Sequence, residues 1–199
     1  AIMTLMVGYL ATQKGESVFK KYRWILYANL LTAFGMLIAF PIEGYALFSI
    51  ILSTLSIVVS YVFAVMYWKD LNSIKVKNNS HLWFKTALFC NAFSSLGAFS
   101  LAIMMAAKII HQTWYLAAEY FYLHFQYNGW FFFACMGLLT ATLFKNANAA
   151  VLKKIFWLFA AAIIPSYFLS TLWMHIPVWM YVLVIIAAVA QCAGWVYMV

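Results

Sequence analysis

The sequence predicts an all-α, polytopic transmembrane helix bundle with about six full spans plus a partial one. Apolar residues make up 68% of the 199 positions and charged residues only 8%, whereas soluble domains are about 45–50% apolar and about 25% charged. The apolar residues form long continuous runs without period-2 alternation, which favours helices over a β-barrel. Basic residues gather in the short connections between these runs, as they do in membrane proteins.

Each span follows from the length of an apolar run. A hydrocarbon core about 30 Å thick needs about 20 helical residues, so residues 1–11 form only part of a span. The full spans are predicted at residues 22–40, 45–68, 86–107, 114–144, 155–173 and 178–199. We expect one transmembrane domain over residues 1–199. The short first run and the start at Ala1 predict that this domain is a fragment of a longer chain.

The distribution of positive charge predicts how the bundle is oriented. Eleven of the twelve Lys and Arg residues lie in the connections 12–23, 69–85 and 145–154. Such residues concentrate on the cytoplasmic side, so these connections are predicted to be cytoplasmic, in a bacterial inner membrane. The net charge of +8 is therefore a topology signal and does not indicate nucleic acid. The expected partners are the lipid bilayer and, as a further possibility, other membrane subunits.

Two residue types have predicted positions in the bundle. Tryptophans near the predicted span ends are expected to form an aromatic belt at the two interfaces: Trp24, Trp68, Trp83, Trp114, Trp173 and Trp179. The cysteines at positions 90, 135 and 192 lie inside apolar runs. We interpret them as small core residues.

The run 114–144 is predicted to hold the functional centre. Ionisable and polar groups inside a membrane are costly, and they mark proton relays or ligand sites. This run contains several of them: Glu119, Tyr120, His124, Gln126, Tyr127 and Asn128. At about 1.5 Å per residue, His124 lies roughly 15 Å below Trp114, near the middle of the membrane.

Helical geometry divides these side chains between two faces. At about 100° per residue, Tyr120, His124, Tyr127 and Asn128 share one stripe, and Glu119 and Gln126 lie on another. We therefore expect partners on more than one neighbouring helix, and a 114–144 helix that is the most enclosed of the bundle. In the next span, Pro165 is predicted to kink the helix and free a carbonyl that Ser166 or a neighbouring helix satisfies.

Two interpretations of each ionisable residue stay open. His124 is either a packing residue hydrogen-bonded to a neighbouring helix, a bond worth about 0.6 kcal/mol on average, or a residue with a metal, haem or proton role. Glu119 is either a protonated acid hydrogen-bonded to a tyrosine or a proton relay.

The stretch HFQYNGWFFFACMGLLTATLFK, residues 124–145, resembles the sixth helix of the catalytic subunit of haem–copper oxidases, and of nitric oxide reductases in particular. In that family this histidine ligates the non-haem metal beside the active haem. The resemblance therefore implies His124 as a metal ligand, with haem b and a non-haem metal as cofactors. It places residues 1–199 at helices II to VIII. The implied function lies in respiration or nitric oxide metabolism, in a catalytic or a non-catalytic member.

The chain departs from that family at the seventh helix. The family has two adjacent histidines there as further metal ligands, whereas IIPSYFLSTLWMHIPVWM has Pro165 and Ser166 in the span and His175 near its outer end. The remaining haem ligands of the family fall outside residues 1–199. Two other hypotheses remain. One is a cofactor-free membrane scaffold or accessory subunit, and the other is a transporter that uses Glu119 and Pro165.

Overall fold

The computed structural model describes residues 1–44, 46–75, 78–109, 111–144, 146–174 and 176–198. These residues form helices and turns with no β-strand among them, which confirms the all-α class. Some residues of the predicted spans and connections lie outside the described ones, among them Tyr45, Lys77, Lys145, His175 and Val199. The chain forms two compact units, residues 1–77 and 78–199, and each is described by itself.

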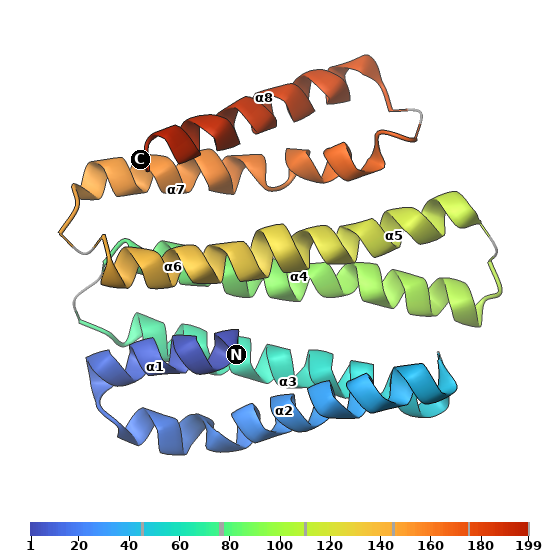
Figure 1. Cartoon of the computed structure of the whole chain (residues 1–199), viewed down its shortest axis with the longest axis horizontal. Coiled ribbons are helices and arrows are strands. Elements are labelled where there is room, and N and C mark those ends of the chain that lie inside the picture. The colour runs from blue at the N-terminus through green and yellow to red at the C-terminus, as the bar shows by residue number, and fades with distance from the viewer. Residues whose placement is uncertain (45, 76–77, 110, 145, 175, 199) are drawn as a thin grey trace. The chain divides into compact units, whose positions relative to one another are not determined.

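The first unit contains α1 (Ile2–Lys14), α2 (Ser17–Glu43) and α3 (Leu47–Asn72) (Figure 1). Gly15 ends α1 with φ 91°, a backbone conformation that glycine adopts at little cost. The core of this unit is aliphatic and aromatic, and its fully buried side chains come from all three helices: Met6, Val7, Leu10, Tyr22, Phe63 and Tyr67.

One ionic cluster connects the three helices of the first unit. The Asp70 carboxylate accepts hydrogen bonds from Lys14 Nζ at 3.0 Å, Lys21 Nζ at 2.6 Å and Tyr22 Oη at 2.7 Å. Asp70 lies beyond the apolar run that ends at Trp68. Burial of the carboxylate opposes its ionisation, but the hydrogen bonds from Lys21, Tyr22 and Lys14 outweigh this effect and hold the pKa of Asp70 below its ordinary value.

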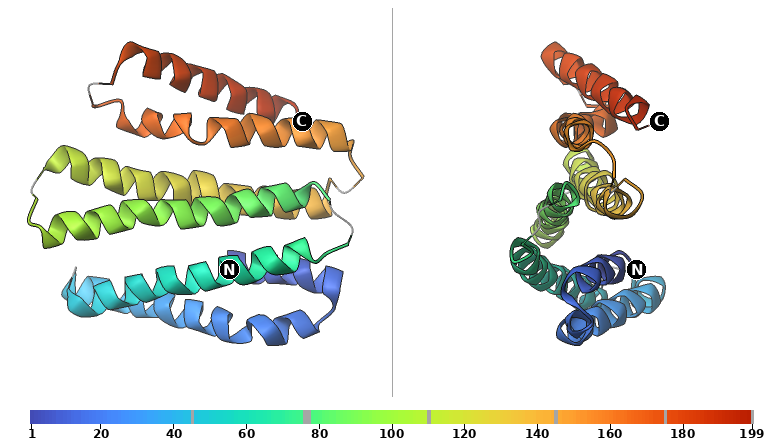
Figure 2. Two further views of the ribbon diagram at one scale, coloured as in Figure 1. Left: turned by 180° about the vertical axis from the view of Figure 1, so that it is seen from behind. Right: turned by 90° about the vertical axis from the view of Figure 1, so that its left-hand side faces the viewer.

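The second unit contains α4 (Ser80–Ala106), α5 (Gln112–His124), a π-helical segment η1 (Phe125–Phe131), α6 (Phe132–Thr142), α7 (Ala149–Ala162), a 3₁₀ segment η2 (Pro165–Thr171) and α8 (Val178–Val196). The three segments over 112–142 follow one another without a break. Within this unit, α4 packs along them, and α7 and η2 pair with α8 (Figure 1 and Figure 2).

Small residues allow α4 and the 112–142 helix to approach closely. A Cβ added at Gly97 would lie 2.6 Å from the carbonyl oxygen of Ala118 and 2.8 Å from the backbone nitrogen of Tyr122. A Cβ at Gly129 would lie 2.6 Å from the Cβ of Cys90. Backbone contact through small residues is typical of helix pairs in membranes.

Within the described ranges, four helices are long and apolar enough to cross a membrane, namely α2, α3, α4 and α8. The pair α7 and η2 also passes as one span, bent by 44°. Many large apolar side chains point outward, and Ile42 (79% exposed) and Val196 (76% exposed) are examples. Lipid can cover such surfaces, so these helices indicate a membrane protein.

Three sequence interpretations are wrong for the described residues. Trp83 is 1% exposed and does not belong to an interfacial belt, because its ring packs among Phe133, Phe156 and other phenylalanines. Cys135 and Cys192 are exposed on the surface of the chain, and only Cys90 is buried. The most enclosed long helix of the second unit is α4, which buries eleven residues because 112–142 and α7 both pack against it.

The basic connections meet at one end of each unit. Lys14 and Lys21 of connection 12–23 contact Asp70 of connection 69–85 in the first unit. In the second unit, Asn79 Nδ2 donates a hydrogen bond to the Ala149 carbonyl at 3.0 Å, which joins connections 69–85 and 145–154. This arrangement agrees with the predicted topology, and the sidedness stays a prediction.

Cysteine labelling in intact cells tests the sidedness. In a variant whose three native cysteines are replaced by serine, Lys20→Cys should react with an impermeant maleimide only after the cells are opened, because its connection is predicted to be cytoplasmic. Lys108→Cys, from the opposite side, is the control and should react in intact cells. Strong labelling of Lys20→Cys from outside would overturn the orientation.

Candidate functional site

His124 lies at a change of helix geometry. It is the last residue of α5, and the π-helical segment η1 begins at the next residue. π-helical turns occur frequently at functional sites. The imidazole is 5% exposed and makes edge contacts with the rings of Phe125 and Tyr167. The structure therefore places His124 in the interior of the second unit, as expected for a polar residue of a predicted span.

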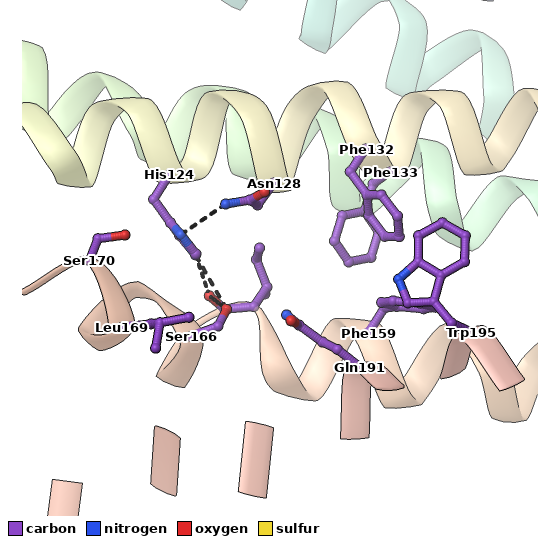
Figure 3. Close-up of a pocket in the computed structure, with 11 residues that line it drawn as sticks. His124, Asn128, Phe132, Phe133, Phe159, Ser166, Leu169, Ser170, Gln191 and Trp195 are labelled. Carbon is purple, nitrogen blue, oxygen red and sulfur yellow. Dashed lines mark hydrogen bonds between the residues drawn. The ribbon is translucent and has the colours of Figure 1, made fainter. Parts of the chain in front are cut away.

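Both ring nitrogens of His124 take part in hydrogen bonds (Figure 3). Nε2 lies 2.8 Å from the carbonyl oxygen of Ile163, which can only accept, so Nε2 donates. Nδ1 then accepts from the side-chain amide of Asn128, whose nitrogen is 3.2 Å away. The network assigns the neutral tautomer with the proton on Nε2, and it connects α5 and η1 to the segment between α7 and η2.

The Ile163 carbonyl is available because the chain tightens from α7 into the 3₁₀ segment η2, which shifts the backbone hydrogen bonds by one residue. Pro165 has no backbone N–H, and α7 ends at Ala162. The Tyr167 N–H bonds to Ile164 and leaves the Ile163 carbonyl to side chains. Ser166 Oγ donates to this carbonyl at 3.1 Å, beside His124. The predicted kink at Pro165 is confirmed by the 44° bend between α7 and η2, and the carbonyl that Ser166 and His124 share beside it is that of Ile163.

Gln126 belongs to a second polar group on another side of the helix. Its side-chain nitrogen donates to Asn91 Oδ1 at 3.1 Å and to Ser94 Oγ at 2.7 Å, both on α4. His124 and Gln126 thus meet partners on different helices, as predicted. The two α4 residues were not among the predicted site residues, although each is a polar residue in a predicted span.

The other predicted members of the centre lie apart from His124. Glu119, Tyr120 and Tyr127 are exposed on the surface of the chain. The tyrosine at 120 contacts the ring of Trp173, and no hydrogen bond to the Glu119 carboxylate appears within the described ranges. Tyr127 leaves the predicted stripe because a π turn holds more residues than an α turn. It therefore lies farther around the axis from His124 than Asn128 does.

A cavity of about 320 Å³ lies beside His124, between the 112–142 helix and the pair formed by α7–η2 and α8. One part of its lining is polar: His124, Asn128, Ser166, Ser170 and Gln191. The opposite part is aromatic: Phe132, Phe133, Phe159 and Trp195 (Figure 3). A cavity of this size, with mixed apolar walls and a few convergent polar groups, is typical of small-molecule sites.

Sequence reasoning missed Ser170 and Gln191. Each is a polar residue inside a predicted span, and Gln191 interrupts the apolar run VLVIIAAVAQCAGWV. Figure 3 shows its side chain extending from α8 into the cavity. A polar residue within an apolar run can be recognised in the sequence, but nothing in the sequence indicates which helix face points inward.

The residues that the structure describes do not fit the three-ligand metal site of the resemblance. Among them, no group of three or more His, Cys, Asp or Glu side chains could hold a metal ion. His124 also uses both ring nitrogens within the protein.

Comparisons of the sequence with protein-family models, with curated proteins and with solved structures each give no match.

Proposed function

We propose that the chain is part of a haem–copper-oxidase-like integral membrane protein of the inner membrane, with six full spans and a partial one. In this proposal the region around His124 is non-catalytic. The observation that carries it is the position of His124. The residue that the resemblance assigns to a metal ligand is buried, faces the following span and borders a polar cavity.

The six proposed spans are the four candidate helices, the bent pair α7 and η2, and one further span over residues 112–142. The segments α5, η1 and α6 continue one another over 112–142, and together they are about 46 Å long at about 1.5 Å per residue. That length exceeds a hydrocarbon core of about 30 Å. This segment corresponds to the sixth helix of the resemblance, and α7 with η2 corresponds to the seventh.

His124 has a connecting role in this proposal. His124 Nε2 donates to the Ile163 carbonyl at the helix break, and the bond from Asn128 to Nδ1 fixes the tautomer of the imidazole. Histidines that ligate metals are oriented in a similar way by a bond from one ring nitrogen to a backbone carbonyl. Here the second nitrogen is engaged by Asn128, so a three-histidine centre is not part of the proposal. Haem b would be held by ligands outside residues 1–199, as the resemblance implies.

An optical spectrum of the purified full-length protein tests the haem-binding part of the proposal. We expect a Soret band in the wild type. His124→Ala should keep the haem and metal content, because the histidine is not a ligand here. It should lower the free energy of unfolding by about 1–3 kcal/mol, because the Ile163 carbonyl loses a donor.

His111→Ala is the matched control, since this exposed residue precedes α5 and makes no capping bond. Its stability should equal that of the wild type. A parallel fall of metal content in folded His124→Ala would contradict the connecting role, because it would identify the histidine as a metal ligand.

A cofactor-free scaffold or accessory subunit is the second candidate. It is favoured by the two polar groups of the 112–142 helix, which both bond to neighbouring helices. Such bonds fix helix packing without any ligand. A full-length protein that purifies without a Soret band would support this candidate over the first.

A further inference from the structure

The cavity beside His124 is lined by two polar side chains, Ser170 and Gln191, that the connecting role of His124 does not explain. His124, Asn128 and Ser166 already bond to one another or to the Ile163 carbonyl. Ser170 and Gln191 line the same cavity. In the described part of the chain, neither side chain makes a hydrogen bond with another group.

Gln191 is the stronger indication of a ligand. It lies within α8, whose length and mean hydropathy are those of a membrane span. An amide in an apolar environment is costly unless it finds a hydrogen-bonding partner. Because its side chain extends into the cavity (Figure 3), a molecule inside the cavity can supply that partner.

The remaining walls indicate the shape of this molecule. Phe132 and Phe159 have ring centroids 4.8 Å apart, and Trp195 lies 6.0 Å and 5.6 Å from these two rings. Aromatic rings pack well against other flat rings, either offset or edge to face. Among the residues that line the cavity, His124 is the one ionisable side chain, and it is neutral. The cavity therefore favours an uncharged molecule.

We propose that this cavity binds an uncharged, lipid-soluble aromatic ring compound with a carbonyl oxygen, which accepts a hydrogen bond from the Gln191 amide while its rings pack on Phe132, Phe159 and Trp195. The inference rests on the membrane-embedded arrangement of the proposed function. It does not depend on haem, since none of these contacts involves a haem ligand.

Benzophenone is a suitable probe, because it is an uncharged two-ring ketone and labels nearby C–H bonds when it is irradiated. The full-length protein in lipid nanodiscs is irradiated with increasing benzophenone, and the adducts are mapped by mass spectrometry. We expect saturable labelling of residues that line the cavity. Gln191→Leu should raise the concentration for half-maximal labelling about tenfold, the effect of one lost hydrogen bond.

Cys192→Leu is the matched control, since it changes the adjacent, exposed residue of α8. It should leave the labelling curve unchanged, and thermal melting verifies that both variants fold. Labelling of the cavity that does not saturate, or that Gln191→Leu does not weaken, would overturn the inference. A spectrum of the same sample keeps the two proposals apart. Saturable labelling without a Soret band would reject haem binding and retain the ring-compound site. A Soret band without saturable labelling would retain haem binding and reject the ring-compound site.

Discussion

Asp70→Ala should lower the free energy of unfolding of the protein by about 2–3 kcal/mol. The substitution removes the common acceptor of Lys14, Lys21 and Tyr22. The Tyr22 side chain is fully buried, so its hydroxyl loses its acceptor away from water. The two ammonium groups would also face each other without a counter-charge. Unfolding by increasing dodecyl sulfate in mixed micelles, followed by circular dichroism, measures the loss.

Glu16→Ala is the control for this experiment. Glu16 is an exposed carboxylate that precedes α2 and makes no capping bond, so its removal should change stability by no more than about 0.5 kcal/mol. Equal effects of the two substitutions would show that the cluster does not hold the first unit together.

The same cluster predicts the sign of a pH effect. The pKa of Asp70 is lowered in the folded protein, so the carboxylate stabilises the fold above the unfolded pKa of about 3.9. This contribution should disappear as the pH falls through the lower, folded-state pKa. The stability difference between the wild type and Asp70→Asn should therefore be constant near neutral pH and shrink under strongly acidic conditions.

Gly97→Leu should destabilise the protein by about 3 kcal/mol, near the upper end of the usual cost of overpacking. The first carbon of any side chain at this position would meet the backbone of Ala118 and Tyr122. Backbone atoms cannot rotate away as the end of a side chain can, so α4 and α5 would have to separate. The same unfolding assay measures the effect.

Gly8→Leu provides the matched comparison. Gly8 is also helical, but a Cβ at this position would meet nothing within 4 Å. Leucine is the better helix former, so this variant should be at least as stable as the wild type. A similar loss in both variants would mean that the cost comes from the added apolar surface and not from the close helix contact.

The helices were largely predictable because the length of an apolar run determines where a helix can cross lipid. The prediction of residues 22–40 lies inside α2 (Ser17–Glu43), and that of 178–199 begins where α8 begins. The observed α2 is longer at its start, because Lys20 and Lys21 continue the helix beyond the apolar run. Hydropathy locates the apolar part of a helix and does not detect such polar turns.

The candidate site was predictable only in part. The burial of His124, its position on one stripe with Asn128 and the break at Pro165 follow from local sequence. The π-helical segment does not, because it depends on how the helix packs, including the contact of Gly129 with Cys90 on α4. To predict Gln191 as a site residue, one would have to know which face of α8 points inward. Trp83 was misplaced because an indole suits both an interface and an aromatic core.

The bond between His124 and the Ile163 carbonyl has a consequence for biosynthesis. Chains emerge from the ribosome with the N-terminal part first, so in the proposed arrangement His124 enters the membrane before residues 149–171. The later segment contains a proline break, and on its own it offers the Ile163 carbonyl only one side-chain donor, the Ser166 hydroxyl. A donor from the earlier helix is then already in place to receive it. Loss of His124 should therefore impair the insertion of the span that follows it.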